Sequence, residues 1–122
     1  LGQAGSRDAV LMKYDKDWWE AFRYAEVDMI LSLTKRKNSD YTGGGSSDNP
    51  FANFDLSADF GVDPITGVNI RMADKFQRAK ALCKDGKLTL DEVGDTADDI
   101  YRDIIGYSLI ILGMLARQRD DS

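Results

Sequence analysis

The sequence contains no histidine, which removes the commonest general base and the commonest metal ligand of proteins. A Ser-His-Asp catalytic triad and a zinc site built on histidines are therefore excluded. Any metal would have to be held by oxygen atoms, which suits Mg²⁺, Mn²⁺ or Ca²⁺. Cys83 is the one cysteine, so no disulfide can form within the chain, and we expect a reducing compartment.

Long apolar runs and net positive charge are lacking as well. The apolar run at positions 104–116 covers about 13 residues, whereas a helix needs about 20 to span a bilayer. We therefore expect no membrane partner. The net charge of −5 argues against a general nucleic-acid-binding protein, which usually has a basic face. It does not exclude small anionic ligands, because a few local basic residues can hold a phosphate group.

The length and composition are those of one globular domain. We expect residues 1–6 to be an expression remnant and residues 7–122 to form a single all-α domain. No signal peptide is visible, and a cytoplasmic location is expected.

Apolar residues at steps of three and four predict long helices. The first runs over about Asp8–Lys37, with a break near Asp15–Asp17. The second begins at Asp63-Pro64, with Asp as N-cap and Pro at the first helical position, and stops at Gly86. The third runs over about Leu90–Arg119 from a capping box. No segment alternates as a strand does. The predicted fold is an all-α helical bundle of three or more helices, with the last two long helices as an antiparallel hairpin.

A long loop containing glycine and phenylalanine is expected between Ser39 and Asp63. Loops of this length in a compact domain are usually functional or disordered, and large apolar residues favour the functional reading. We expect four of them to fold the loop back onto the body, and positions 57–60 to form one short helical turn. These four are Phe51, Phe54, Leu56 and Phe60. The role of positions 43–62 is left open.

An acidic stripe follows one side of the third helix. Glu92, Asp95, Asp99 and Asp103 fall within about 80° of each other on a helical wheel. Like charges at i,i+4 destabilise an isolated helix by a few tenths of a kcal/mol, and a bound cation would offset that cost. The alternative is a solvated or arginine-paired face, with the first two acids complementing the helix dipole.

The second helix carries a matching basic stripe. Arg71, Asp74, Lys75 and Arg78 fall within about 100° on the wheel. In an antiparallel hairpin this stripe can face the acidic one. The result is either a set of interhelical salt bridges or a site where carboxylates hold a metal and cations hold phosphate oxygens.

A third group of polar residues lies where the first helix is expected to end. The basic run at positions 35–37 is followed by Asn38, Asp40 and Tyr41 and then by glycines. This composition suits a phosphate or a base, but no Gly-Lys-Ser/Thr follows, so it is not a Walker A loop. A charged helix end before a flexible loop is the simpler alternative.

The order of several motifs resembles a family of small phage and bacterial domains called nucleotide-modification-associated. The resemblance covers about residues 31–115, and it implies a nucleotide context and the cytoplasm of an infected or host bacterium. The motifs are Lys37-Asn38-Ser39-Asp40-Tyr41, Pro50-Phe51-Ala52-Asn53-Phe54, Gly67-Val68, the run from Arg71 to Arg78, the run from Asp91 to Asp99, and Gly106-Tyr107-Ser108.

The third helix is also similar to the second metal motif of MazG-like all-α nucleotide pyrophosphohydrolases. That motif is Glu-x-x-Asp, present here as Glu92-Val93-Gly94-Asp95 and followed by Asp99. Those enzymes add Glu-x-x-Glu from a partner helix, and this chain has no such pair upstream. Asp74 stands among basic residues instead, so the resemblance implies binding more than cleavage.

These patterns predict a protein that binds a nucleotide-like molecule, with Mg²⁺ or Mn²⁺ as the expected cofactor. Glu92, Asp95 and Asp99 are the expected catalytic residues and metal ligands, and Asp74 is a further metal ligand. The expected ligand and phosphate contacts are Lys37, Asn38, Asp40, Tyr41, Arg71, Lys75 and Arg78.

Three functions stay open at this point. They are a metal-dependent nucleotide phosphohydrolase or pyrophosphohydrolase, a protein that binds or sequesters a nucleotide without turnover, and a structural or partner-binding helical module. No long nucleic acid is expected as a partner. The apolar residues left over on the third helix, Ile105, Leu109 and Leu112, predict a homo-oligomer.

Overall fold

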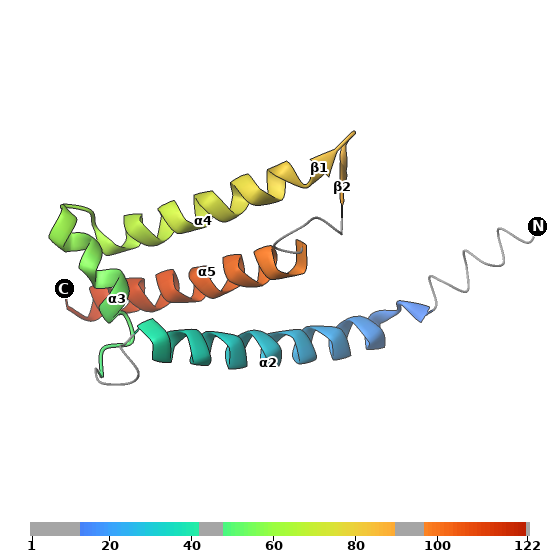
Figure 1. Cartoon of the computed structure of the whole chain (residues 1–122). Coiled ribbons are helices and arrows are strands. Elements are labelled where there is room, and N and C mark those ends of the chain that lie inside the picture. The colour runs from blue at the N-terminus through green and yellow to red at the C-terminus, as the bar shows by residue number, and fades with distance from the viewer. Residues whose placement is uncertain (1–12, 42–47, 90–96, 122) are drawn as a thin grey trace, which may run out of the picture. The chain divides into compact units, whose positions relative to one another are not determined.

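The computed structural model describes residues 13–41, 48–89 and 97–121, and it is mostly helical (Figure 1). This confirms the all-α expectation. The elements are α2 (Lys16–Tyr41), α3 (Ala52–Asp55), the 3₁₀ helix η1 (Leu56–Phe60), α4 (Pro64–Ala81), β1 (Cys83–Lys84), β2 (Lys87–Leu88) and α5 (Ala97–Asp120). None of the helices in these ranges is long and apolar enough to cross a membrane. The chain divides into two compact units, Leu1–Leu33 and Thr34–Ser122, which are described separately.

The first unit contains the N-terminal part of α2. This helix begins at Lys16 because Asp15 caps it: the carboxylate of Asp15 accepts a hydrogen bond from the backbone N–H of Trp18 at 2.9 Å. The break predicted near Asp15–Asp17 is confirmed, because Lys13 is helical, Tyr14 and Asp15 are not, and the helix resumes at Lys16. Next to the cap, neighbouring aromatic rings contact each other with centroids 4.9–6.4 Å apart, and all of them are partly exposed. They belong to Tyr14, Trp18, Trp19 and Phe22.

The other end of α2 differs from the prediction. The helix continues to Tyr41, so the loop does not begin at Ser39. The basic run at positions 35–37 is inside a helix and does not end it. Residue numbers 34–41 belong to the second unit.

The start of α4 is as predicted, and its end is not. The Asp63 carboxylate accepts a hydrogen bond from the N–H of Thr66 at 3.2 Å, and Pro64 is the first helical residue. The helix ends at Ala81, before Gly86, and a small antiparallel ladder pairs Cys83 with Leu88. The two turn residues, Asp85 and Gly86, have φ of 53° and 74°, which a two-residue hairpin turn of this hand requires. The Asp-Gly pair was thus a hairpin signal, and the prediction of no strand was wrong.

Two apolar clusters hold α4 beside α5. The first joins Ala79 and Leu82 at the end of α4 to Ala97 and Ile100 at the start of α5. The second joins Val68 near the start of α4 to Met114 near the end of α5, and Phe54 of α3 completes it. The two helices therefore contact each other near both ends of α4, and Figure 1 shows them side by side in the second unit.

The loop before α4 folds back only in part. Phe54 is buried, and Phe51 packs against the second cluster. Leu56 and Phe60 are 52% and 85% exposed, so the expectation was wrong for these two residues. The short helical turn expected at positions 57–60 is confirmed by η1. Positions 42–47 of the loop lie outside the described residues.

Candidate functional site

Asp103 lies between two lysines from other helices. Its Oδ1 is 2.5 Å from the Nζ of Lys37 on α2, and its Oδ2 is 2.9 Å from the Nζ of Lys75 on α4. The side chains of Asp103 and Lys75 are only 15% and 14% exposed, and that of Lys37 is 39% exposed. One carboxylate on α5 therefore gathers two ammonium groups, and we call Lys37, Asp103 and Lys75 the lysine–aspartate cluster.

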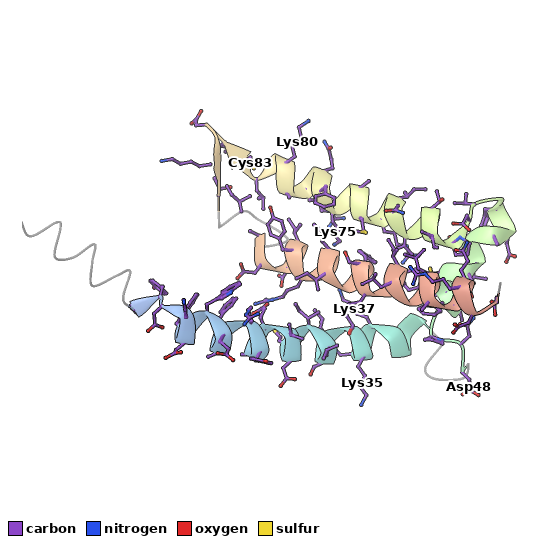
Figure 2. The ribbon with its side chains drawn as sticks, turned by 180° about the vertical axis from the view of Figure 1, so that it is seen from behind. Lys35, Lys37, Asp48, Lys75, Lys80 and Cys83 are labelled. Carbon is purple, nitrogen blue, oxygen red and sulfur yellow. The ribbon has the colours of Figure 1, made fainter. Side chains whose placement is uncertain are left out.

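Figure 2 shows how differently the labelled lysines of the second unit are directed. Lys37 and Lys75 point towards α5, whereas Lys35 and Lys80 on the same two helices point away from it. Of these four lysines, only Lys37 and Lys75 are therefore directed towards Asp103. It contains two of the residues expected to hold phosphate.

The charge state of Asp103 follows from these contacts. Burial would raise the pKa of its carboxyl, but the hydrogen bonds and charges of Lys37 and Lys75 outweigh burial and hold the pKa below its usual value of 3.8. The carboxylate is therefore ionised at neutral pH.

Gly106 of α5 lies where Thr34, in the part of α2 that belongs to the second unit, approaches α5 closely. Gly106 is buried, and a Cβ atom there would lie 3.2 Å from the methyl group of Thr34. Thr34 precedes Lys37 by one helical turn, just as Asp103 precedes Gly106. The close approach and the ion pair therefore belong to the same contact between the two helices.

Arg71 lies one helical turn before Lys75, on the same face of α4. Its guanidinium is 4.7 Å from the ring centroid of Phe54, a cation–π contact. The flat face of the guanidinium lies over the ring, so the N–H groups at its edge stay available, and the ring fixes their direction. The buried Phe54 therefore fixes the direction of a third cation expected to hold phosphate.

The other charged residues of the two stripes form pairs along their own helices. Arg78 is 3.3 Å from Asp74, and both side chains are at least half exposed. Arg102 is 3.6 Å from Asp99, whose side chain is 57% exposed. An arginine beside a carboxylate competes with a divalent cation for the same oxygens. Asp74 and Asp99 therefore do not by themselves make a metal site.

Several expected site residues lie outside what the structure describes. These are Glu92 and Asp95, and the side chains of Asn38, Asp40 and Tyr41. In the described ranges there is no group of three or more acidic or cysteine side chains placed to hold a metal ion. The Mg²⁺ or Mn²⁺ site stays a prediction that depends on Glu92 and Asp95.

A second polar network was not predicted from the sequence. Arg117 near the end of α5 donates two hydrogen bonds to Asp55 of α3, at 2.8 and 3.0 Å, and the amide of Asn49 donates a third at 2.9 Å. The hydrogen bond from Arg117 holds the pKa of Asp55 below its usual value, and Asp55 in turn raises the pKa of Arg117. Arg117 also stacks on Phe51, 4.8 Å from the ring centroid. This network fastens the loop to α5.

The sequence contains a partial signal for the lysine–aspartate cluster and none for the network of Asp55 and Arg117. Asp103 directly precedes the apolar run that begins at Ile104, which is a sign of partial burial in the sequence. Its lysine partners could not be chosen without knowing where α2 packs. Asp55 and Arg117 are 62 positions apart in the chain, and no pattern in the sequence pointed to their contact.

Comparisons with protein-family models, with curated proteins and with solved structures found no match to this chain.

Proposed function

We propose that this chain binds a phosphorylated, nucleotide-like small molecule at the lysine–aspartate cluster without converting it. One observation carries the proposal: Asp103 gathers two ammonium groups from different helices at a partly buried position. Both groups lie within hydrogen-bond distance of one carboxylate and therefore lie near each other, and a single phosphate group is the proposed ligand for both. Asp103 would act as a positioning residue, and Lys37 and Lys75 would contact the ligand.

Phosphate is the ligand chemistry that this arrangement favours. The chain is acidic overall, at −5, so a place where cations converge is an exception in its charge distribution. A lysine ammonium carries three N–H donors and binds phosphate as a compact charge. A lysine that gives one N–H to Asp103 can still donate to a phosphate oxygen.

Arg71 would extend the site along α4. Its edge N–H groups suit a second phosphate oxygen, and the stack on Phe54 limits the entropy that Arg71 loses on binding. The segment that contains Asn38, Asp40 and Tyr41 follows Lys37 in the chain and stays our proposed contact for the base or sugar.

Binding is favoured over cleavage by the state of the carboxylates. Metal-assisted hydrolysis needs acids that hold the metal and one that activates water. Asp103 is paired with two lysines, and Asp74 and Asp99 lie beside arginines. A phosphohydrolase that uses Glu92, Asp95 and Asp99 with Mg²⁺ is therefore the alternative.

The proposal takes α4 and α5 as an antiparallel hairpin within a helical bundle. Support comes from the two apolar clusters, which join opposite ends of the two helices. It also takes the chain as a homo-oligomer, which the exposed apolar residues Ile105, Leu109 and Leu112 of α5 support.

A nucleotide panel tests the function. The full chain would be incubated with nucleoside mono-, di- and triphosphates and with pyrophosphate, each with and without Mg²⁺. Its melting temperature and the recovered ligand would then be measured. We expect at least one nucleotide to raise the melting temperature and to be recovered intact. Release of phosphate or pyrophosphate that is lost in Asp95→Ala would establish the enzyme instead. If no compound changed the melting temperature, the proposed ligand would be ruled out and the lysine–aspartate cluster would have only a structural role.

A further inference from the structure

The helix α5 has an exposed apolar face that neither α4 nor residues 34–41 cover. Tyr101, Ile105, Leu109 and Leu112 are 45%, 45%, 43% and 59% exposed, and Ala116 is exposed as well. They follow each other in steps of three and four, so all five lie within about 80° on the helical wheel. We call these five residues the α5 stripe.

The remaining sides of α5 are occupied. Ile100 and Met114 face the clusters shared with α4, roughly opposite the α5 stripe on the wheel. Asp103 and Gly106 lie about 100–160° from the centre of the α5 stripe on the wheel, where they meet Lys37 and Thr34. The α5 stripe thus belongs neither to the core nor to the lysine–aspartate cluster.

The residues of the α5 stripe can pair with the same residues of a second, antiparallel copy. Placed antiparallel against a second copy, with a two-fold axis between positions 108 and 109, Ile105 lies opposite Leu112. The large Tyr101 then lies opposite the small Ala116, and Leu109 lies at the axis. In such a contact each large side chain meets a small or medium one, as interdigitating helices require.

The charges at the ends of the α5 stripe follow the same symmetry. Asp98 lies in the first turn of α5 and Arg119 in the last, and both project from the same side of the helix as the α5 stripe. In the same antiparallel register, Asp98 of each copy lies opposite Arg119 of the other. A parallel pairing would instead bring like charges together at both ends.

We propose that the α5 stripe is the contact surface of a homodimer in which two α5 helices pack antiparallel about a two-fold axis. The inference combines the exposed apolar residues, the matched large and small positions, and the opposite charges at the two ends. It does not depend on the proposed ligand, because the lysine–aspartate cluster lies on another side of α5.

The mass of the full chain in solution tests the dimer. Sedimentation equilibrium of the wild type should give twice the chain mass, falling towards one chain mass on dilution. Leu112→Glu should raise the dissociation constant by about 100-fold or more, since a charge would be buried near the two-fold axis. Ile70→Glu, an exposed apolar residue on α4, is the matched control and should leave the dissociation constant unchanged. A wild type that stays at one chain mass at all concentrations would overturn the proposal.

The charge pairs and the register test the orientation. Asp98→Arg and Arg119→Asp should each weaken the dimer, and the double variant should restore it. In a Cys83→Ser background, Tyr101→Cys combined with Ala116→Cys should cross-link two chains under mild oxidation, and Tyr101→Cys alone should not. Cross-linking by Tyr101→Cys alone would show a parallel contact. Dimerisation that survives Leu112→Glu would place the interface elsewhere. Circular dichroism of each variant separates loss of the dimer from loss of the fold.

Discussion

Among single residues, Asp103 has the largest consequences. It is the last acid of the predicted acidic stripe, and its side chain is only 15% exposed. Burial works against its charge, and two lysines more than compensate for that cost. The same balance makes the lysine–aspartate cluster costly to disturb, because removing one partner leaves another charge poorly solvated.

The two lysines should differ in their effect on stability. Lys75→Met should lower the free energy of unfolding by about 1–3 kcal/mol, since it removes a charged hydrogen bond from a mostly buried place. Lys37→Met should cost about 0–1 kcal/mol, because the Lys37 side chain is more exposed and is screened by water. Urea denaturation of both variants measures the difference. An equal loss in the two would show that burial does not set the strength of these pairs.

Acid should weaken the fold through Asp103 and Asp55. Both carboxyls have a pKa below the usual 3.8 in the folded chain, so their stabilisation is fully present above that value. It is lost as pH falls from about 4 through the lowered pKa values, where the folded state must take up protons. Unfolding measured between pH 6 and pH 2 should show this decline. In Asp103→Asn it should be shallower, and an unchanged slope would contradict the assignment.

At the scale of elements, the helix starts that carry capping residues were the ones that could be predicted from the sequence. The start of α4 was predicted from Asp63 and Pro64, which act within one turn, whereas for α2 only a break near Asp15 was predicted. The end of α4 was misplaced because Asp85-Gly86 serves a hairpin turn, and a glycine after a helical pattern looks the same in either role. The outward direction of Leu56 and Phe60 was not predictable, since it depends on where η1 is held by neighbouring segments.

The two glycines of α5 should respond differently to alanine. A Cβ at position 113 would lie 2.8 Å from Cζ of Phe51, whose ring is also stacked by Arg117. Gly113→Ala should therefore be destabilising, although alanine gains about 1 kcal/mol of helix propensity. Gly106→Ala meets only a methyl group of Thr34, at 3.2 Å, and should be closer to neutral. Thermal unfolding of the two variants decides this, and a more stable Gly113→Ala would show that Phe51 moves easily.

The cap of α4 gives a further test at this scale. Asp63→Ala removes the acceptor for the Thr66 N–H and should cost about 0.5–2 kcal/mol. Asp63→Ser keeps a capping oxygen and should recover most of the loss. Equal effects of the two substitutions in urea denaturation would show that the cap contributes little.

For the whole molecule, the helical class could be predicted from periodicity, and the site could be predicted only in part. Lys37 and Lys75 were expected ligands, and Asp103 brings both together. The wheel could not show this arrangement, because it needs the packing of residues 34–41 against α5. Asp74, Arg78 and Asp99 were chosen by the same wheel, yet they lie in exposed pairs along their helices. A helical wheel thus shows which residues share one side of a helix, but it does not show whether that side contacts another helix.

The central claim is that the lysine–aspartate cluster holds a phosphate. The most direct measurement is calorimetric titration of the nucleotide selected by the panel into four variants: Lys37→Met, Lys75→Met, Lys35→Met and Lys80→Met. Lys35 and Lys80 are lysines of the same helices that point away from α5, so they control for the loss of one positive charge (Figure 2). We predict that affinity falls by about tenfold or more in Lys37→Met and in Lys75→Met. The two control variants should keep the wild-type affinity at moderate salt. Equal losses in all four variants, or none in any of them, would contradict the account.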